Sequence, residues 1–167
     1  MPMIDGYEIA RATKDDIAGI MELQEPNLPD HGGMLSVRFP AAWFETAIAA
    51  MPVIVARREG RVVGYLVSSS MAANAGVPIV QTMLRSYRGA ADAYIQGPIC
   101  VDDVERGRGL AAAMFAELRA LLPGREGITF VRRDNAASLR AHAKMGMREV
   151  TEFTHGGVLF VALSHDG

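Results

Sequence analysis

The segment Val101–Ala111 (VDDVERGRGLA) constrains the fold more than any other part of the chain. An apolar run, AYIQGPICV, leads through a short acidic turn into a basic loop with two glycines, and a helical pattern follows. The first N–H groups of a helix have no intrahelical partner, and the helix dipole adds about half a positive charge there. Because Gly107 and Gly109 let a ligand approach the backbone, the loop predicts a phosphate or pyrophosphate site.

A second segment, Asn135–Met147 (NAASLRAHAKMGM), predicts another helix with clear ends. Asn135 is a favourable N-cap residue, and Gly146 fits the C-terminal end of a helix. The apolar side of this helix is expected at Leu139, Ala143 and Met145.

Composition limits the classes of protein that fit. The 167 residues predict a single domain, 1–167, and a net charge of −2 gives no reason to expect nucleic acid or an anionic membrane as partner. A single cysteine, Cys100, allows neither a disulfide framework nor a cysteine zinc site, and the start of the chain lacks a secretory pattern, so we expect a cytoplasmic protein. The uncharged stretch Val62–Leu84 contains polar and helix-breaking residues, so it is interpreted as strand, loop and helix rather than a membrane span.

Periodicity predicts an alternation of strands and helices. Strands are expected at 7–12, 52–57, 61–69, 93–101, 127–132, 147–154 and 158–163, and helices from Thr13, at 41–50, 78–87, 109–122 and 136–145. Residues 25–40, rich in Gly and Pro, are expected to be loop, and Gly97-Pro98 predicts a bulge in its strand. One central sheet with helices on its faces accounts for this order.

Two motifs resemble the GNAT superfamily of acetyl-CoA-dependent N-acetyltransferases. Arg106-x-x-Gly109-x-Ala111 resembles its (Gln/Arg)-x-x-Gly-x-(Gly/Ala) loop, which grips the pyrophosphate of coenzyme A. Asn135–Met147 resembles its Asn-x-x-Ala-x-x-x-Tyr-x-x-x-Gly-Phe segment, with Ser138, His142 and Met147 in place of Ala, Tyr and Phe. The resemblance covers roughly residues 50–163.

The resemblance implies an α/β (α+β) fold. Its central sheet is mixed and mostly antiparallel, with about six to seven strands, about four to five flanking helices and splayed central strands. The pantetheine arm would bond the backbone of the strand before the loop. The implied coenzyme-binding residues are Ile99, Cys100, Val101, Arg106, Gly107, Arg108, Gly109, Leu110, Ala111, Asn135, Ser138 and His142.

The resemblance also suggests catalytic roles. The backbone N–H of Val101 or Cys100 would polarise the thioester carbonyl, and His142 stands where the family often has a tyrosine that protonates the departing thiolate. Tyr94 and Tyr87 are alternative hydroxyls. No base stands out among Glu45, Asp92, Gln96 and His31, Cys100 is expected to be an inert buried residue, and His155 and His165 are interpreted as surface or terminal residues.

The predicted function is transfer of an acetyl group from acetyl-CoA, as the acyl-donor substrate, to a primary amine of a small molecule or protein. No metal is expected, and a homodimer is compatible with the resemblance. The alternative is a catalytically silent acyl-CoA-binding regulatory module, which the replacement of Tyr by His142 keeps open.

Overall fold

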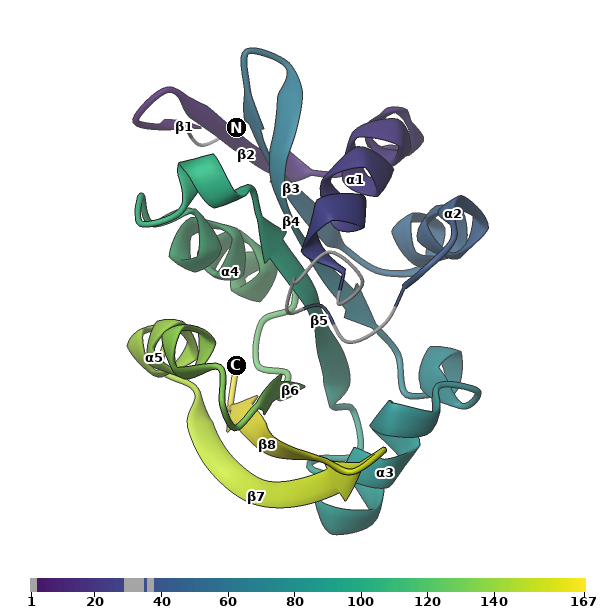
Figure 1. Ribbon diagram of the computed structural model, residues 1–167. Coiled ribbons are helices and arrows are strands. Elements are labelled where there is room, and N and C mark those ends of the chain that lie inside the picture. The colour runs from purple at the N-terminus through teal and green to yellow at the C-terminus, as the bar shows by residue number, and fades with distance from the viewer. Residues whose placement is uncertain (1–2, 29–34, 36–37) are drawn as a thin grey trace. The chain divides into compact units, whose positions relative to one another are not determined.

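The structure, a computed structural model, describes residues 3–28, 35 and 38–167 (Figure 1). Among them, no helix is both long and apolar enough to cross a membrane. In chain order the elements are β1 (Met3–Ile4), β2 (Tyr7–Arg11), η1 (Lys14–Asp16), α1 (Ile17–Gln24), η2 (Glu25–Asn27), α2 (Ala41–Ala50), β3 (Val53–Arg58), β4 (Arg61–Ser69), η4 (Ala72–Asn74), α3 (Pro78–Ser86), β5 (Tyr94–Val101), η5 (Asp103–Glu105), α4 (Leu110–Leu121), β6 (Gly127–Arg132), α5 (Ala136–Lys144), β7 (Arg148–His155) and β8 (Val158–His165).

The chain forms two compact units, and β5 contributes residues to both. The first unit comprises Met1–Ser68 and Gly97–Leu121, with strand order β1-β2-β3-β4-β5. The second comprises Ser69–Gln96 and Leu122–Gly167, with strand order β5-β6-β8-β7. Only the β5–β6 ladder is recorded as parallel, and the other recorded ladders are antiparallel. The described residues therefore confirm the predicted mixed, mostly antiparallel sheet, and their five α-helices agree with the predicted four to five.

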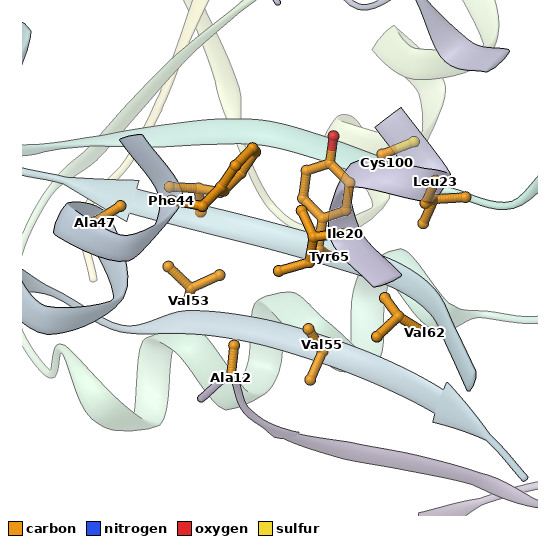
Figure 2. Packing of buried hydrophobic residues seen from close by; sticks show 11 residues of the cluster. Ala12, Ile20, Leu23, Phe44, Ala47, Val53, Val55, Val62, Tyr65 and Cys100 are labelled. Carbon is orange, nitrogen blue, oxygen red and sulfur yellow. The ribbon is translucent and has the colours of Figure 1, made fainter. Parts of the chain in front are cut away.

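The core of the first unit lies between β3 and β4 on one side and α1 and α2 on the other (Figure 2). Val55 and Tyr65 point from the strands toward Ile20 of α1 and Phe44 of α2, and the Phe44 and Tyr65 rings meet edge to face at 5.9 Å. Successive side chains of a strand point to opposite faces, so Gly64 faces the other way. That other face is covered by α4, because a Cβ added at Gly64 would lie 3.1 Å from the Met114 side chain.

The second unit has its own buried clusters. The rings of Phe130, Phe153 and Phe160 pack against one another. In a second cluster, the carboxylate of Glu126 accepts hydrogen bonds from the Tyr87 hydroxyl (2.6 Å), the Ala90 N–H (2.7 Å) and the Ser164 hydroxyl. A buried carboxylate needs such partners, so this cluster fastens the ends of β6 and β8 to the chain before β5.

The structure differs from the sequence-based expectations at a few positions. The helix expected from Thr13 begins with the short turn η1, closed by a capping box between Thr13 and Asp16. Leu121, the last residue of α4, is 38% exposed, and Phe115 is buried. At Gly97-Pro98, where a bulge was predicted, the peptide bond is cis and Gly97 has a φ of 123°.

Candidate active site

The loop between β5 and α4 has the geometry of an anion site. The Asp102 side chain accepts from the Val104 N–H and starts η5, and Arg106 then returns to an extended conformation. Gly107 and Gly109 have φ values of +79° and +81°, which side chains rarely tolerate. The first helical bond recorded for α4 runs from the Ala113 N–H to the Gly109 carbonyl (3.0 Å), so the preceding N–H groups form the helix's open end.

Both glycines of the loop face open space. A Cβ added at Gly107 or Gly109 would meet nothing within 4 Å. Their need for glycine therefore comes from the backbone conformation and not from packing inside the protein. Space directly in front of a helix N-terminus is where a phosphate can accept several backbone N–H bonds.

The two arginines of the loop are held by the protein. Arg106 donates to the Val101 carbonyl (3.2 Å), to Asp103 Oδ1 (3.1 Å) and to Asn27 Oδ1 (2.9 Å). Arg108 donates to the Tyr7 hydroxyl (3.2 Å) and lies 3.9 Å from Glu105 Oε1. These contacts show that both arginines help to fix the loop.

Glu105 is a buried carboxylate directly before the loop, 2% exposed. It accepts a hydrogen bond from the Tyr7 hydroxyl (2.6 Å) and two from Arg58 (3.1 and 3.3 Å). The Tyr7 hydroxyl, together with Arg58 and Arg108, lowers the pKa of Glu105 against the opposing effect of burial. Glu105 is therefore ionised at neutral pH and ties the loop to β2 and β3.

The direction of the β5 backbone groups distinguishes the two N–H groups predicted to donate to the thioester carbonyl, those of Cys100 and Val101. The Asp102 N–H donates to the Val63 carbonyl of β4 (2.8 Å), and the Cys100 carbonyl faces Gly64 of the same strand. Backbone groups of a strand point alternately to its two sides, so Cys100 also directs its N–H toward β4. Ile99 and Val101 direct theirs to the opposite edge of β5, which makes Val101 the better candidate to meet a thioester.

Helix α5, in the second unit, begins and ends as the sequence predicts. Asn135 Oδ1 accepts from the Ser138 N–H (3.1 Å), and Gly146 after the helix has a φ of +90°. One turn after Ser138, the His142 ring lies 3% exposed, with Nδ1 2.7 Å from the Ser138 carbonyl. A carbonyl only accepts, so Nδ1 carries the hydrogen and Nε2 is the acceptor in the neutral ring. Burial lowers the pKa of His142, opposed by the Ser138 carbonyl.

The alternative hydroxyls have partners of their own. Tyr94 is fully buried, and its hydroxyl lies 3.0 Å from His165 Nε2 and 3.4 Å from Gln96 Oε1. His165 is 4% exposed, so its interpretation as a surface residue is wrong. Burial follows because β8 continues to His165, opposite Gly127, whose missing side chain leaves room for the Tyr94 and His165 rings. His155 is half-buried and bonds Thr82 through Nδ1 (2.9 Å).

The candidate bases do not gather at one place. Glu45 is exposed and lines a pocket of about 580 Å³ with residues 11–14, Ile48 and Ala49, and Asp92 is exposed as well. Gln96 bonds inside the Tyr94 cluster, and His31 lies outside the described residues. Among the described residues, no three His, Cys, Asp or Glu side chains could hold a metal ion together.

The sequence missed the residues that support the loop. Tyr7, Asn27 and Arg58 contact Glu105 or the loop arginines from positions 47 to 101 residues away. No local pattern connects them to the loop, since tertiary packing of β2, β3 and η2 brings them to it. Glu105 belongs to the acidic run before the arginines, which marks it as a possible partner for them, but the run does not indicate that Glu105 is buried.

Comparison with known proteins agrees with this geometry. The acetyltransferase (GNAT) family model matches residues 17–147. Similar solved structures include Arabidopsis thaliana NAA60 in complex with acetyl-CoA (16% identity, 96% of this chain and 99% of that chain, TM-score 0.72). Others are a phosphinothricin acetyltransferase from Sinorhizobium meliloti in complex with acetyl-CoA (21%, 96% and 88%, 0.70) and a ribosomal-protein-alanine N-acetyltransferase from Brucella melitensis (20%, 95% and 99%, 0.70). These likenesses show the fold, and no curated protein matches the chain by sequence. Because the family model spans well over half of the chain, the protein belongs to the GNAT family of acetyltransferases.

Proposed function

We propose that this chain transfers the acetyl group of acetyl-CoA to a primary amine of a small molecule or a protein, by direct attack of the amine on the thioester. The two compact units would act as one acetyltransferase domain, residues 1–167. The free, buried Cys100 fits a reducing compartment, which supports a cytoplasmic location.

The observation that carries the proposal is the open N-terminal end of α4. Gly107 and Gly109 hold a backbone conformation that costs stability with other residues, in front of empty space and free helix N–H groups. Such a loop favours a pyrophosphate, and acetyl-CoA is the donor bound in the related structures from Arabidopsis thaliana and Sinorhizobium meliloti. The bound coenzyme would then run from the loop along the free edge of β5.

The β5 edge supplies the electrophilic part of the reaction. The Val101 N–H points away from β4 and would donate to the thioester oxygen as negative charge develops there. Arg106 donates to the Val101 carbonyl, which belongs to the next peptide group, and so restrains the backbone directly after the donor N–H. Positioning the amine against a carbonyl held in this way can supply much of the rate enhancement.

The proton for the departing thiolate is assigned to His142 as a proposal, with Tyr94 as the alternative. A lowered pKa means that the charged ring is abundant only at acidic pH, whereas the neutral ring offers an acceptor at Nε2. Tyr94 could release its proton and take another from the His165 ring, whereas Gln96 Oε1 only accepts from the Tyr94 hydroxyl. A pH profile of kcat at saturating free amine separates the two, because a phenol stays protonated to much higher pH.

A catalytically silent acyl-CoA-binding module remains the second candidate. The observation in its favour is the buried, neutral His142 at the position where the family often has a tyrosine acid. Such a module would bind acetyl-CoA through the same loop but release no free coenzyme in the presence of amines.

The decisive experiment measures thiol release from acetyl-CoA with a panel of amines, beginning with phosphinothricin and a short peptide with N-terminal alanine. These two represent the acceptors named for related structures. Mass spectrometry of the acceptor confirms N-acetylation, and calorimetry with acetyl-CoA alone measures donor binding. Binding with turnover supports the enzyme, binding without turnover on a broad panel supports the silent module, and absence of binding contradicts both.

A further inference from the structure

The Tyr65 hydroxyl is a buried polar group without a conventional partner. Its residue is fully buried on β4, and among the described residues its oxygen is the buried side-chain N or O atom that has no hydrogen bond. The other tyrosines differ: Tyr7 bonds Glu105, Tyr87 bonds Glu126, and Tyr94 lies against His165. An unpaired buried hydroxyl costs stability, so its retention needs a reason.

The polar group beside this hydroxyl is the Cys100 thiol. The Asp102–Val63 bond sets the register of β5 against β4. Two residues back along β5 and two residues forward along β4, this register places Cys100 opposite Tyr65. Both side chains join the cluster of α1 and α2 residues on one face of the sheet (Figure 2). Burial raises the pKa of Cys100 to about 12, and burial beside Cys100 raises that of Tyr65. Both groups therefore stay protonated at neutral pH, and sulfur is only a weak hydrogen-bond partner.

The pair lies on the face of β4 and β5 that α1 and α2 cover. Helix α4, which carries the phosphate loop, covers the opposite face, as the contact between Gly64 and Met114 shows. Val101, the proposed donor to the thioester oxygen, is the next residue after Cys100. An amine that attacks the thioester from the α1 and α2 side would therefore come close to the Tyr65 hydroxyl.

We propose that the Tyr65 hydroxyl, beside the Cys100 thiol, is a contact for the acceptor that binds a polar atom at or next to the attacking amine. This inference rests on the proposed function. A neutral hydroxyl can accept from an amine N–H or donate to a neighbouring oxygen, and it orients the amine without removing its proton. The acceptor class it favours has a hydrogen-bonding group within one or two bonds of the nitrogen.

The test does not require the natural acceptor. Coenzyme A alkylated with iodoacetamide carries an S-carbamoylmethyl group, whose amide places polar atoms beside the sulfur, and S-isobutyl-coenzyme A has nearly the same shape without them. Calorimetry gives the affinity ratio of the two probes for wild type and for Tyr65→Phe, which removes one oxygen atom. We expect the preference for the amide probe to fall about tenfold in the variant, equivalent to about 1.4 kcal/mol.

Thermal unfolding provides the structural control. Tyr65→Phe should melt at or above the wild-type temperature because it removes an unpaired polar atom, whereas Tyr87→Phe should melt lower because it breaks the bond to Glu126. An unchanged probe ratio in Tyr65→Phe overturns the contact while the proposed function stands. A clear loss of melting temperature in Tyr65→Phe also overturns it, because the hydroxyl would then have an internal partner. If neither probe nor acetyl-CoA binds the wild type, the proposed function fails and this inference fails with it.

Discussion

Replacement of Gly109 by valine tests the phosphate loop most directly. Gly109 has a φ of +81°, and a side chain in that left-handed region costs about 1–2 kcal/mol of folding stability. The added Cβ meets no protein atom within 4 Å, so it projects into the space assigned to the pyrophosphate. We expect acetyl-CoA affinity to fall at least about tenfold, or ~1.4 kcal/mol.

Gly60 provides a matched control for backbone strain. It has a φ of +78° in the turn between β3 and β4, and a Cβ there also meets nothing within 4 Å. Gly60→Val should lose a similar amount of stability in thermal unfolding and keep wild-type affinity in calorimetry. Unchanged affinity in a folded Gly109→Val protein, or an equal loss in both variants, would refute the reasoning.

Three further outcomes are expected. Asn135→Ala should lose about 1 kcal/mol of stability with its helix cap and also bind acetyl-CoA more weakly; a change confined to the melting temperature would make Asn135 purely structural. If His142 is the acid, kcat should fall as the pH rises, and the fall should lie below about pH 6.5 because the pKa of His142 is lowered. His142→Tyr should move that fall to higher pH. Equal pH profiles in the two proteins, together with a near-normal rate for His142→Ala, would show that another group supplies the proton. Glu105 has a lowered pKa, so its contribution to stability is present above about pH 4.5 and is lost as the pH falls through the folded-state value. The acid limb of unfolding should therefore be shallower in Glu105→Gln, and an unchanged limb would show that the Glu105 charge has no stabilising role.

The elements of the fold follow from local patterns in the sequence. Helix α2 has the predicted bounds, 41–50, and both loop glycines adopt a positive φ, which glycine tolerates better than other residues. His165 was misjudged because its burial depends on Gly127, a residue on another strand. The same limit hid the support of Arg106 by Asn27, since a contact across 79 residues leaves no periodic trace.

The candidate site was predicted in part for the same physical reason. Backbone conformation at Gly107 and Gly109 is local, so the glycine-dependent turn of the proposed phosphate loop was predictable from eleven residues. The distinction between Cys100 and Val101 required the strand register, which the Asp102–Val63 bond provides. The partner of the Tyr94 hydroxyl and the lack of one, among the described residues, at the Tyr65 hydroxyl depend on packing between elements, and no residue spacing encodes that information.

The pairing of the loop arginines with carboxylates bears on how ionic strength affects the protein. Arg106 lies 3.1 Å from Asp103 and Arg108 lies 3.9 Å from Glu105, so much of their charge is already balanced before any ligand arrives. Dissolved ions screen exposed charges strongly and short-range bonds to backbone amides much less. A coenzyme held chiefly by those amides should bind with nearly the same strength in dilute buffer and in concentrated salt.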